Sequence, residues 1–151
     1  MIKKDILVRL LVIILAFVHP LIILLVCGEI FSFSAAWKTQ LQPLFIITNA
    51  ATSYFLYSVK KWEVSSIFLL LLTAFSVDFT PVFHNILALM FFLSCIPPLY
   101  SINRLRYFTY IYLLSVPLLL LGSLFWFELM ATWVLCAYHF KLMWEVLKLE
   151  K

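Results

Sequence analysis

The sequence has little charge and almost no glycine. Charged residues make up 12% of its 151 residues, against about 25% in ordinary soluble domains. A soluble fold of this size keeps most of its surface in water, so this composition excludes a soluble enzyme, a nucleic-acid-binding domain and a disordered chain. The two glycines, Gly28 and Gly122, are too few for glycine-mediated helix crossings, and packing must use Ala, Ser, Thr and larger side chains.

Motifs of catalysis and metal binding are missing as well. The three cysteines, Cys27, Cys95 and Cys136, are widely spaced in apolar sequence and form no C-x-x-C. This spacing indicates buried thiols and neither a disulfide framework nor a zinc site. No G-x-S-x-G, P-loop or H-E-x-x-H motif occurs, and so we assign no catalytic residue.

Long apolar runs dominate what is present. Hydrophobic residues make up 66% of the chain, and short polar breaks separate six continuous apolar segments. At 1.5 Å per residue, each such segment crosses or nearly crosses a hydrocarbon core of about 30 Å as a helix. The sequence therefore predicts a single all-α domain, a polytopic bundle of six transmembrane helices. The predicted spans are roughly 6–27, 41–59, 62–78, 81–100, 105–125 and 126–147.

The basic residues predict the orientation of this bundle. With a cytoplasmic N-terminus, all Lys and Arg except Lys38 fall on the cytoplasmic side, which places the C-terminus there too. The net charge of +4 is then explained by basic residues that lie beside anionic headgroups on the cytoplasmic side. It does not require a nucleic-acid partner. We expect a multi-pass protein of the inner (plasma) membrane. The cytoplasmic residues are Lys3, Lys4, Arg9, Lys60, Lys61, Arg104, Arg106, Lys141, Lys148 and Lys151.

Polar residues inside the spans follow two stripes at helical spacing. The second span carries one stripe and the sixth span the other, and each costs free energy unless it faces protein or water. Both stripes are therefore expected in the bundle interior, either as interhelical hydrogen bonds or as the lining of a cavity. The residues are Asn49, Ser53 and Tyr57 on the second span, and Glu128, Thr132, Cys136 and His139 on the sixth.

A second polar group lies at the predicted outer hairpin between the third and fourth spans. Asp78 precedes the turn, while His84 and Asn85 lie about one turn into the fourth span. Glu29 and Glu128 approach from the other outer connections. A histidine with carboxylate neighbours suits an acid–base pair, a metal site or a headgroup site. Hydrogen bonds that hold the hairpin together are the structural alternative.

The histidines do not suggest a cofactor. A bis-histidine haem needs two imidazoles at matching depth on facing helices. His139 lies far deeper than His84, and Pro20 directly follows His19, the better match in depth. We expect neither haem nor a metal ion at His84 or His19.

The middle of the chain resembles a known membrane superfamily. An Asn early in the second span (Phe45–Asn49) is followed by a plain third span, and the fourth span opens with His84, Ala88 and Phe92 in an H-x-x-x-A-x-x-x-F pattern. This resembles the six-helix superfamily of the damage-regulated autophagy modulators, the Frag and Sfk proteins and their uncharacterised bacterial relatives. The resemblance covers about half the chain. It implies six helices, cytoplasmic termini and a role in membrane lipid organisation.

Three functions follow as hypotheses. The first is a small membrane protein that acts through lipid binding or organisation, or as a subunit of a membrane complex, with its site around Asp78 and His84. The second is a transporter or channel subunit with a polar path along spans two and six. The third is a membrane enzyme that acts on a lipid headgroup. Membrane lipids are the expected partners, with other membrane proteins in the case of a complex, and the sequence favours a non-enzymatic role.

Overall fold

The fold is a bundle of antiparallel helices. The computed structural model describes residues 2–28, 32–75, 80–122 and 124–149, and every regular element within these ranges is helical. The prediction of an all-α chain is therefore confirmed. The elements are α1 (Ile2–Cys27), η1 (Phe33–Lys38), α2 (Gln42–Tyr57), α3 (Glu63–Ala74), α4 (Pro81–Ser94), α5 (Ile96–Tyr100), η2 (Asn103–Leu105), α6 (Tyr107–Leu113), α7 (Val116–Leu120) and α8 (Leu124–Leu149).

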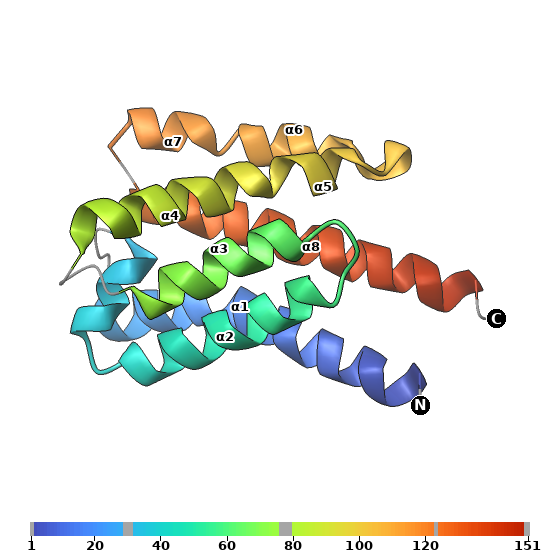
Figure 1. Ribbon diagram of the computed structural model, residues 1–151, viewed down its shortest axis with the longest axis horizontal. Coiled ribbons are helices and arrows are strands. Elements are labelled where there is room, and N and C mark those ends of the chain that lie inside the picture. The colour runs from blue at the N-terminus through green and yellow to red at the C-terminus, as the bar shows by residue number, and fades with distance from the viewer. Residues whose placement is uncertain (1, 29–31, 76–79, 123, 150–151) are drawn as a thin grey trace.

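The described helices run back and forth along one direction (Figure 1). The passes are α1, α2, α3, α4 with α5, α6 with α7, and α8, and they follow the order of the six predicted segments. Helix α1 begins and α8 ends at the same end of the bundle, where the α2–α3 and α5–α6 connections also lie. We call this the basic end, because the described Lys and Arg residues except Lys38 gather there, and the opposite end the far end.

Two of the described helical stretches are long and apolar enough to cross a membrane, namely Asp5–Cys27 and Pro81–Tyr100. Helices α2 and α3 have 16 and 12 residues, which makes them about 24 Å and 18 Å long at the standard helical rise. They are shorter than the hydrocarbon core of an average bilayer. Helix α8 has 26 residues and is long enough to cross a bilayer. Its apolar sequence is interrupted by the polar stripe that was predicted for the sixth span.

Prolines divide two of the passes. Helix α4 ends at Ser94 and α5 begins at Ile96, directly before Pro97. Helix α6 ends at Leu113 and α7 begins at Val116, directly before Pro117. A proline removes one backbone donor and clashes with the preceding turn, which explains both interruptions. Pro20 lies within the single helix α1.

Large side chains and serine pairs hold the bundle together. The main core contains Leu56, Trp62, Leu99 and Tyr138 among other residues. Between α2 and α3, Ser53 Oγ donates to the carbonyl of Ser66 at 2.8 Å, and Ser66 Oγ donates back to the carbonyl of Ser53 at 2.7 Å. Small hydroxyl side chains let these two helices approach closely, in place of the missing glycines.

Candidate functional site

Three cavities follow one another along α2 and α8. The first is a hollow of about 360 Å³ that opens at the basic end. It shares Ile13, Phe55 and His139 with a central cavity of about 80 Å³. The central cavity shares Asn49 and Thr132 with a third space of about 60 Å³, the Glu128 cavity. The shared linings make one row of spaces from the basic end toward the far end.

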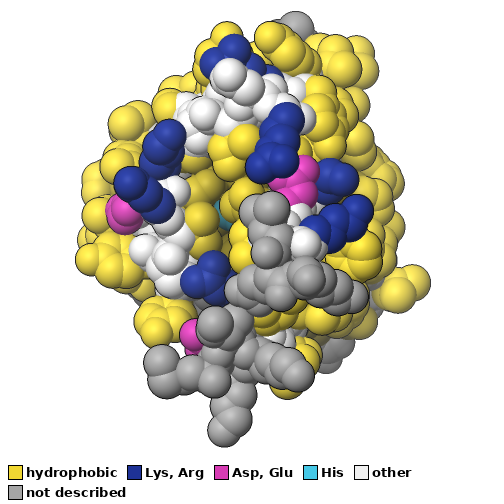
Figure 2. Space-filling model, turned by 90° about the vertical axis from the view of Figure 1, so that its right-hand side faces the viewer, with side chains coloured by type: hydrophobic (Ala, Val, Ile, Leu, Met, Phe, Trp, Pro, Cys, Tyr) yellow, Lys and Arg dark blue, Asp and Glu magenta, His cyan; other side chains and the backbone are white. Residues whose placement is uncertain are grey.

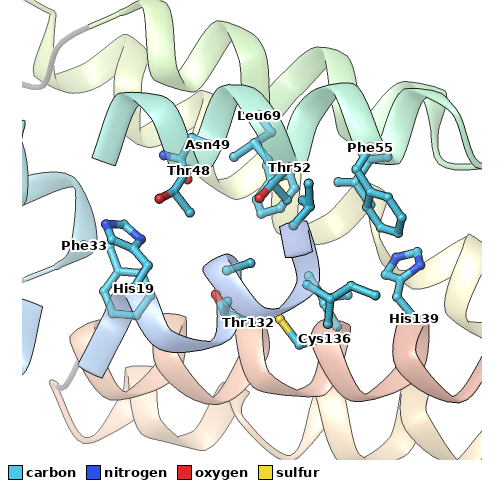
Figure 3. Close-up of a pocket in the computed structure, with 16 residues that line it drawn as sticks. His19, Phe33, Thr48, Asn49, Thr52, Phe55, Leu69, Thr132, Cys136 and His139 are labelled. Atoms are coloured by element: carbon cyan, nitrogen blue, oxygen red, sulfur yellow. The ribbon is translucent and has the colours of Figure 1, made fainter. Parts of the chain in front are cut away.

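Polar side chains from two facing helices line the central cavity (Figure 3). Thr48, Asn49 and Thr52 come from α2, and their side chains point toward α8. Thr132 and Cys136 come from α8 and point back toward α2. Thr52 follows Thr48 by four residues and Asn49 by three, and Cys136 follows Thr132 by four. This spacing puts the residues of each helix on one face, and the two faces share one space.

Three residues that line this cavity carry buried polar atoms without a described partner. His19 Nε2, Thr48 Oγ1 and His139 Nε2 have no hydrogen-bond partner among the described residues, and all three residues line the cavity. They are 3%, 2% and 5% exposed. Most buried polar groups in native proteins are hydrogen-bonded to protein or ordered water. Three such atoms around one space therefore indicate a cavity that holds water or a polar ligand.

His139 stands between the hollow and the central cavity and lines both. Its ring packs against Trp62 at 4.5 Å, Phe55 at 5.0 Å and Tyr138 at 5.3 Å between centroids. Figure 2, a view onto the basic end, shows Lys and Arg side chains around a central hollow and a histidine at its bottom. Arg9 and Asp5 also line this hollow. Charged residues therefore lie at its opening, and the aromatic rings packed on His139 lie at its inner end, which we call the neck.

Glu128 lies toward the opposite end of the row. Its carboxylate is buried, and its Oε2 accepts a hydrogen bond of 2.6 Å from the backbone N–H of Phe33 in η1. Glu128 lines the cavity named after it, together with Ser34, Asn49 and Thr132. Beyond it lies a small apolar cluster, with Ile23, Ala36, Phe45, Phe125 and Leu129 as its buried residues.

The two predicted stripes differ in what they do. On α8 the stripe of Glu128, Thr132, Cys136 and His139 does line the cavities. On α2 only Asn49 does so, since Ser53 bonds to Ser66 of α3. The prediction of an interior position is wrong for Tyr57, which is 62% exposed at the end of α2.

The predicted outer cluster is not assembled by the described residues. His84 is 0% exposed, and its Nδ1 lies 2.6 Å from the carbonyl oxygen of Phe75, next to the end of α3. Asn85 is exposed on α4. Placing Glu128 in an outer connection was wrong, because it lies inside α8 and is buried. Asp78 and Glu29 lie outside the described residues, so a headgroup site there stays a prediction.

Sequence reasoning missed three lining residues, His19, Thr48 and Thr52. Thr48 and Thr52 are four residues apart and flank Asn49, a repeat that could have extended the polar face of α2. His19 was weighed only as a haem ligand, although a polar residue inside an apolar span is by itself a sign of a polar interior. In the structure it packs against Phe33 and Phe45, at 6.3 Å and 6.0 Å between ring centroids.

The site holds no evident metal-binding group. Within the described ranges, no three His, Cys, Asp or Glu side chains converge in a way that suits a metal ion. Among apolar side chains, the polar lining of the central and Glu128 cavities consists of hydroxyl, amide, imidazole and thiol groups and one carboxylate. Comparison with protein-family models, with curated proteins and with solved structures gave no match for this chain.

Proposed function

We propose that this chain is a multi-pass protein of the inner (plasma) membrane, and that it gives a small polar solute a path from the cytoplasmic face into the bundle. In this proposal all six helical passes cross or enter the bilayer, and the basic end faces the cytoplasm. The protein then acts as a small transporter or as the subunit of a channel.

The outer surface supports the membrane part of the proposal. Large apolar side chains are exposed on all sides of the bundle, such as Leu25 at 85%, Val82 at 74% and Leu114 at 73%. Soluble monomers rarely expose contiguous apolar patches beyond a few hundred Å². The gathering of Lys and Arg at one end (Figure 2) matches the bias of cytoplasmic loops toward positive charge.

The row of cavities supports the solute path, and the single observation that carries it is the unpartnered polar lining of the central cavity. A bundle that used its interior polar residues only for helix association would pair them, as Ser53 and Ser66 do. His19, Thr48 and His139 instead keep buried polar atoms without a described partner, and all three residues line a space that continues to the hollow at the basic end.

The size of the path limits the solute. A cavity needs a volume of about 10–15 Å³ open to the centre of a water-sized sphere to hold one water molecule. The central cavity, at about 80 Å³, therefore has room for several waters and not for a sugar or a peptide. The proposal is restricted to solutes of about the size of water.

The test uses Cys136, whose side chain reaches the central cavity (Figure 3). In a variant with Cys27→Ser and Cys95→Ser, Cys136 is the single thiol. The protein is reconstituted in lipid vesicles and exposed to silver nitrate in chloride-free buffer. It is then denatured, and the free thiol is counted with a maleimide. We expect rapid protection of Cys136 by the silver ion and none by a bulky charged thiol reagent.

The matched control keeps Cys95 as the single thiol, in a variant with Cys27→Ser and Cys136→Ser. Cys95 is also buried, at 0% exposed against 7% for Cys136, but lines none of the three cavities, so silver should reach it slowly. Since silver is charged, it does not arrive through the acyl chains beside α1 and α8. Equal and slow reaction of both thiols would overturn the proposed path.

A further inference from the structure

The ionisable groups of the proposed path stand in a row. Among the described residues that line the central and Glu128 cavities, the ionisable ones are His19, Cys136, His139 and Glu128. His139 is at the neck of the hollow, and Glu128 lies 11 residues earlier on α8, about 16 Å away at the standard rise. The space between them is lined by the hydroxyl and amide groups of α2 and α8.

Glu128 is the single carboxylate among these lining residues, and its surroundings leave it able to take up a proton. A carboxylate offers two oxygens with about four lone-pair positions. One position at Oε2 is occupied by the N–H of Phe33. The side chain lines a cavity with Ser34, Asn49 and Thr132, so hydroxyl and amide groups surround the space into which it opens.

Resting on the function proposed above, we infer that the solute is the proton, with Glu128 as its binding group and His139 as the group at which it enters. The reaction is a reversible transfer. A proton leaves a hydronium ion in the hollow and forms an N–H bond at Nε2 of His139. It then passes along water molecules in the central cavity and forms an O–H bond on the Glu128 carboxylate, which becomes neutral. No other reactant is consumed.

The remaining charges near the row come from several elements. Helix α1 contributes His19 to the central cavity and Asp5 with Arg9 to the hollow. Helix α2 and η1 contribute Asn49 and Ser34, which are uncharged. The residues of α3 and α4 that line the two inner cavities are apolar: Leu69, Leu72, Phe91 and Phe92. Within the described lining, the Glu128 carboxylate therefore faces no fixed cation inside the bundle.

The lining favours the proton over an alkali cation. Hard cations take several oxygen ligands, whereas two of the ionisable groups that line the row are the imidazoles of His19 and His139. An imidazole nitrogen can accept a proton and release it again. The small volumes of the central and Glu128 cavities also suit a short chain of waters better than an ion with its hydration shell.

The test measures proton entry into vesicles that contain the purified chain and a trapped pH-sensitive dye. A potassium gradient with valinomycin makes the vesicle interior negative and drives protons inward. We expect acidification by the unaltered chain. Glu128→Gln should slow it by about a hundredfold, the lower end of what a positioned proton-transfer group contributes. His139→Phe should slow it as well, while Glu128→Asp should restore part of the rate.

The control is Glu145→Gln. Glu145 is also on α8, but it pairs with Arg104 at 3.2 Å and lines none of the three cavities, so its loss should leave proton entry unchanged. An equal rate for Glu128→Gln and the unaltered chain overturns the inference. Absence of proton entry, or sodium-ion uptake that depends on Glu128, also overturns it. If silver still reaches Cys136, the solute path itself survives that outcome.

A second measurement covers the case in which Glu128→Gln does not fold. Infrared difference spectra of the reconstituted unaltered chain, taken between high and low pH, should show a protonated carboxylic C=O band from a buried site. The band should persist in Glu145→Gln and shift in Glu128→Asp. A spectrum without such a band, or a band that does not respond to Glu128→Asp, contradicts proton binding by Glu128.

Discussion

Glu128 in α8 and Phe33 in η1 are 95 positions apart and are joined by a hydrogen bond of 2.6 Å from the Phe33 N–H to the carboxylate. This contact ties the short helix η1 at the far end to α8, which has 26 residues. It also lies where the row of cavities ends. The group that we propose to bind the proton is therefore the same group that holds η1 against α8.

The first prediction concerns the hydrogen bond between Phe33 and Glu128. In Glu128→Ala the buried N–H of Phe33 loses its acceptor, which should cost about 1–3 kcal/mol. The peptide that contains Phe33 should then exchange its amide hydrogen about tenfold or more faster, since 1.4 kcal/mol is a factor of ten. Glu128→Gln keeps an acceptor oxygen without the charge, and its effect should be intermediate. The measurement is hydrogen exchange followed by mass spectrometry in vesicles or nanodiscs.

Exchange elsewhere provides the comparison for this experiment. The α2–α3 connection is at the opposite end of the bundle and should exchange alike in all three proteins. If Glu128→Ala leaves the Phe33 peptide as protected as before, η1 is held by its apolar contacts and the hydrogen bond contributes little.

A second prediction addresses the serine pair between α2 and α3. Ser53→Ala and Ser66→Ala should each lower the free energy of unfolding, and the double variant should lose less than the sum. The coupling should fall near 0.6 kcal/mol, with about 1.7 kcal/mol as the upper end for polar contacts in membrane helices. A double-mutant cycle in mild detergent measures it. Ser101→Ala, which removes a local bond to the carbonyl of Pro98, should show no coupling to Ser53→Ala.

The third prediction separates a structural histidine from a ligand-binding one at the far end. His84→Ala removes a fully buried side chain and its contact with Phe75, and the cavity left behind should lower the unfolding free energy by about 2–5 kcal/mol. The neighbouring Asn85→Ala, at an exposed position, should stay within about 0.5 kcal/mol. Thermal unfolding in detergent measures both variants. Near-equal effects would contradict a structural role for His84.

The sequence predicts the helices well and the interior less well, for a physical reason. Continuous apolar runs and prolines specify where a helix begins and breaks, and these are local properties of the chain. The predicted third span, 62–78, extends past the end of α3 at Ala74, and its residues 76–78 lie outside the described residues. Hydropathy alone does not mark the last helical turn.

Whether a polar residue of a stripe lines a cavity or bonds to another helix depends on which helix packs against it. Asn49 and Ser53 are one turn apart, yet Asn49 lines the cavity and Ser53 bonds to α3. Helix α2 packs against both α1 and α3, and its polar residues divide between these two neighbours. Nothing in the spacing distinguishes them. On α8 the stripe was predicted correctly as interior, because polar and charged side chains within a long apolar helix are favoured on the side that faces protein.

The last prediction concerns the neck between the hollow and the central cavity. Phe55 lines both spaces and packs its ring on His139 at 5.0 Å. In Phe55→Leu the neck should widen, and a small charged thiol reagent larger than silver should then react with Cys136 in the variant that keeps it as the single thiol. Phe108→Leu is the matched control, since Phe108 is also buried and packs on Tyr138 but lines none of the three cavities. Faster reaction in both variants would indicate general loosening of the bundle, whereas faster reaction in Phe55→Leu alone would identify the Phe55–His139 contact as the constriction that limits entry.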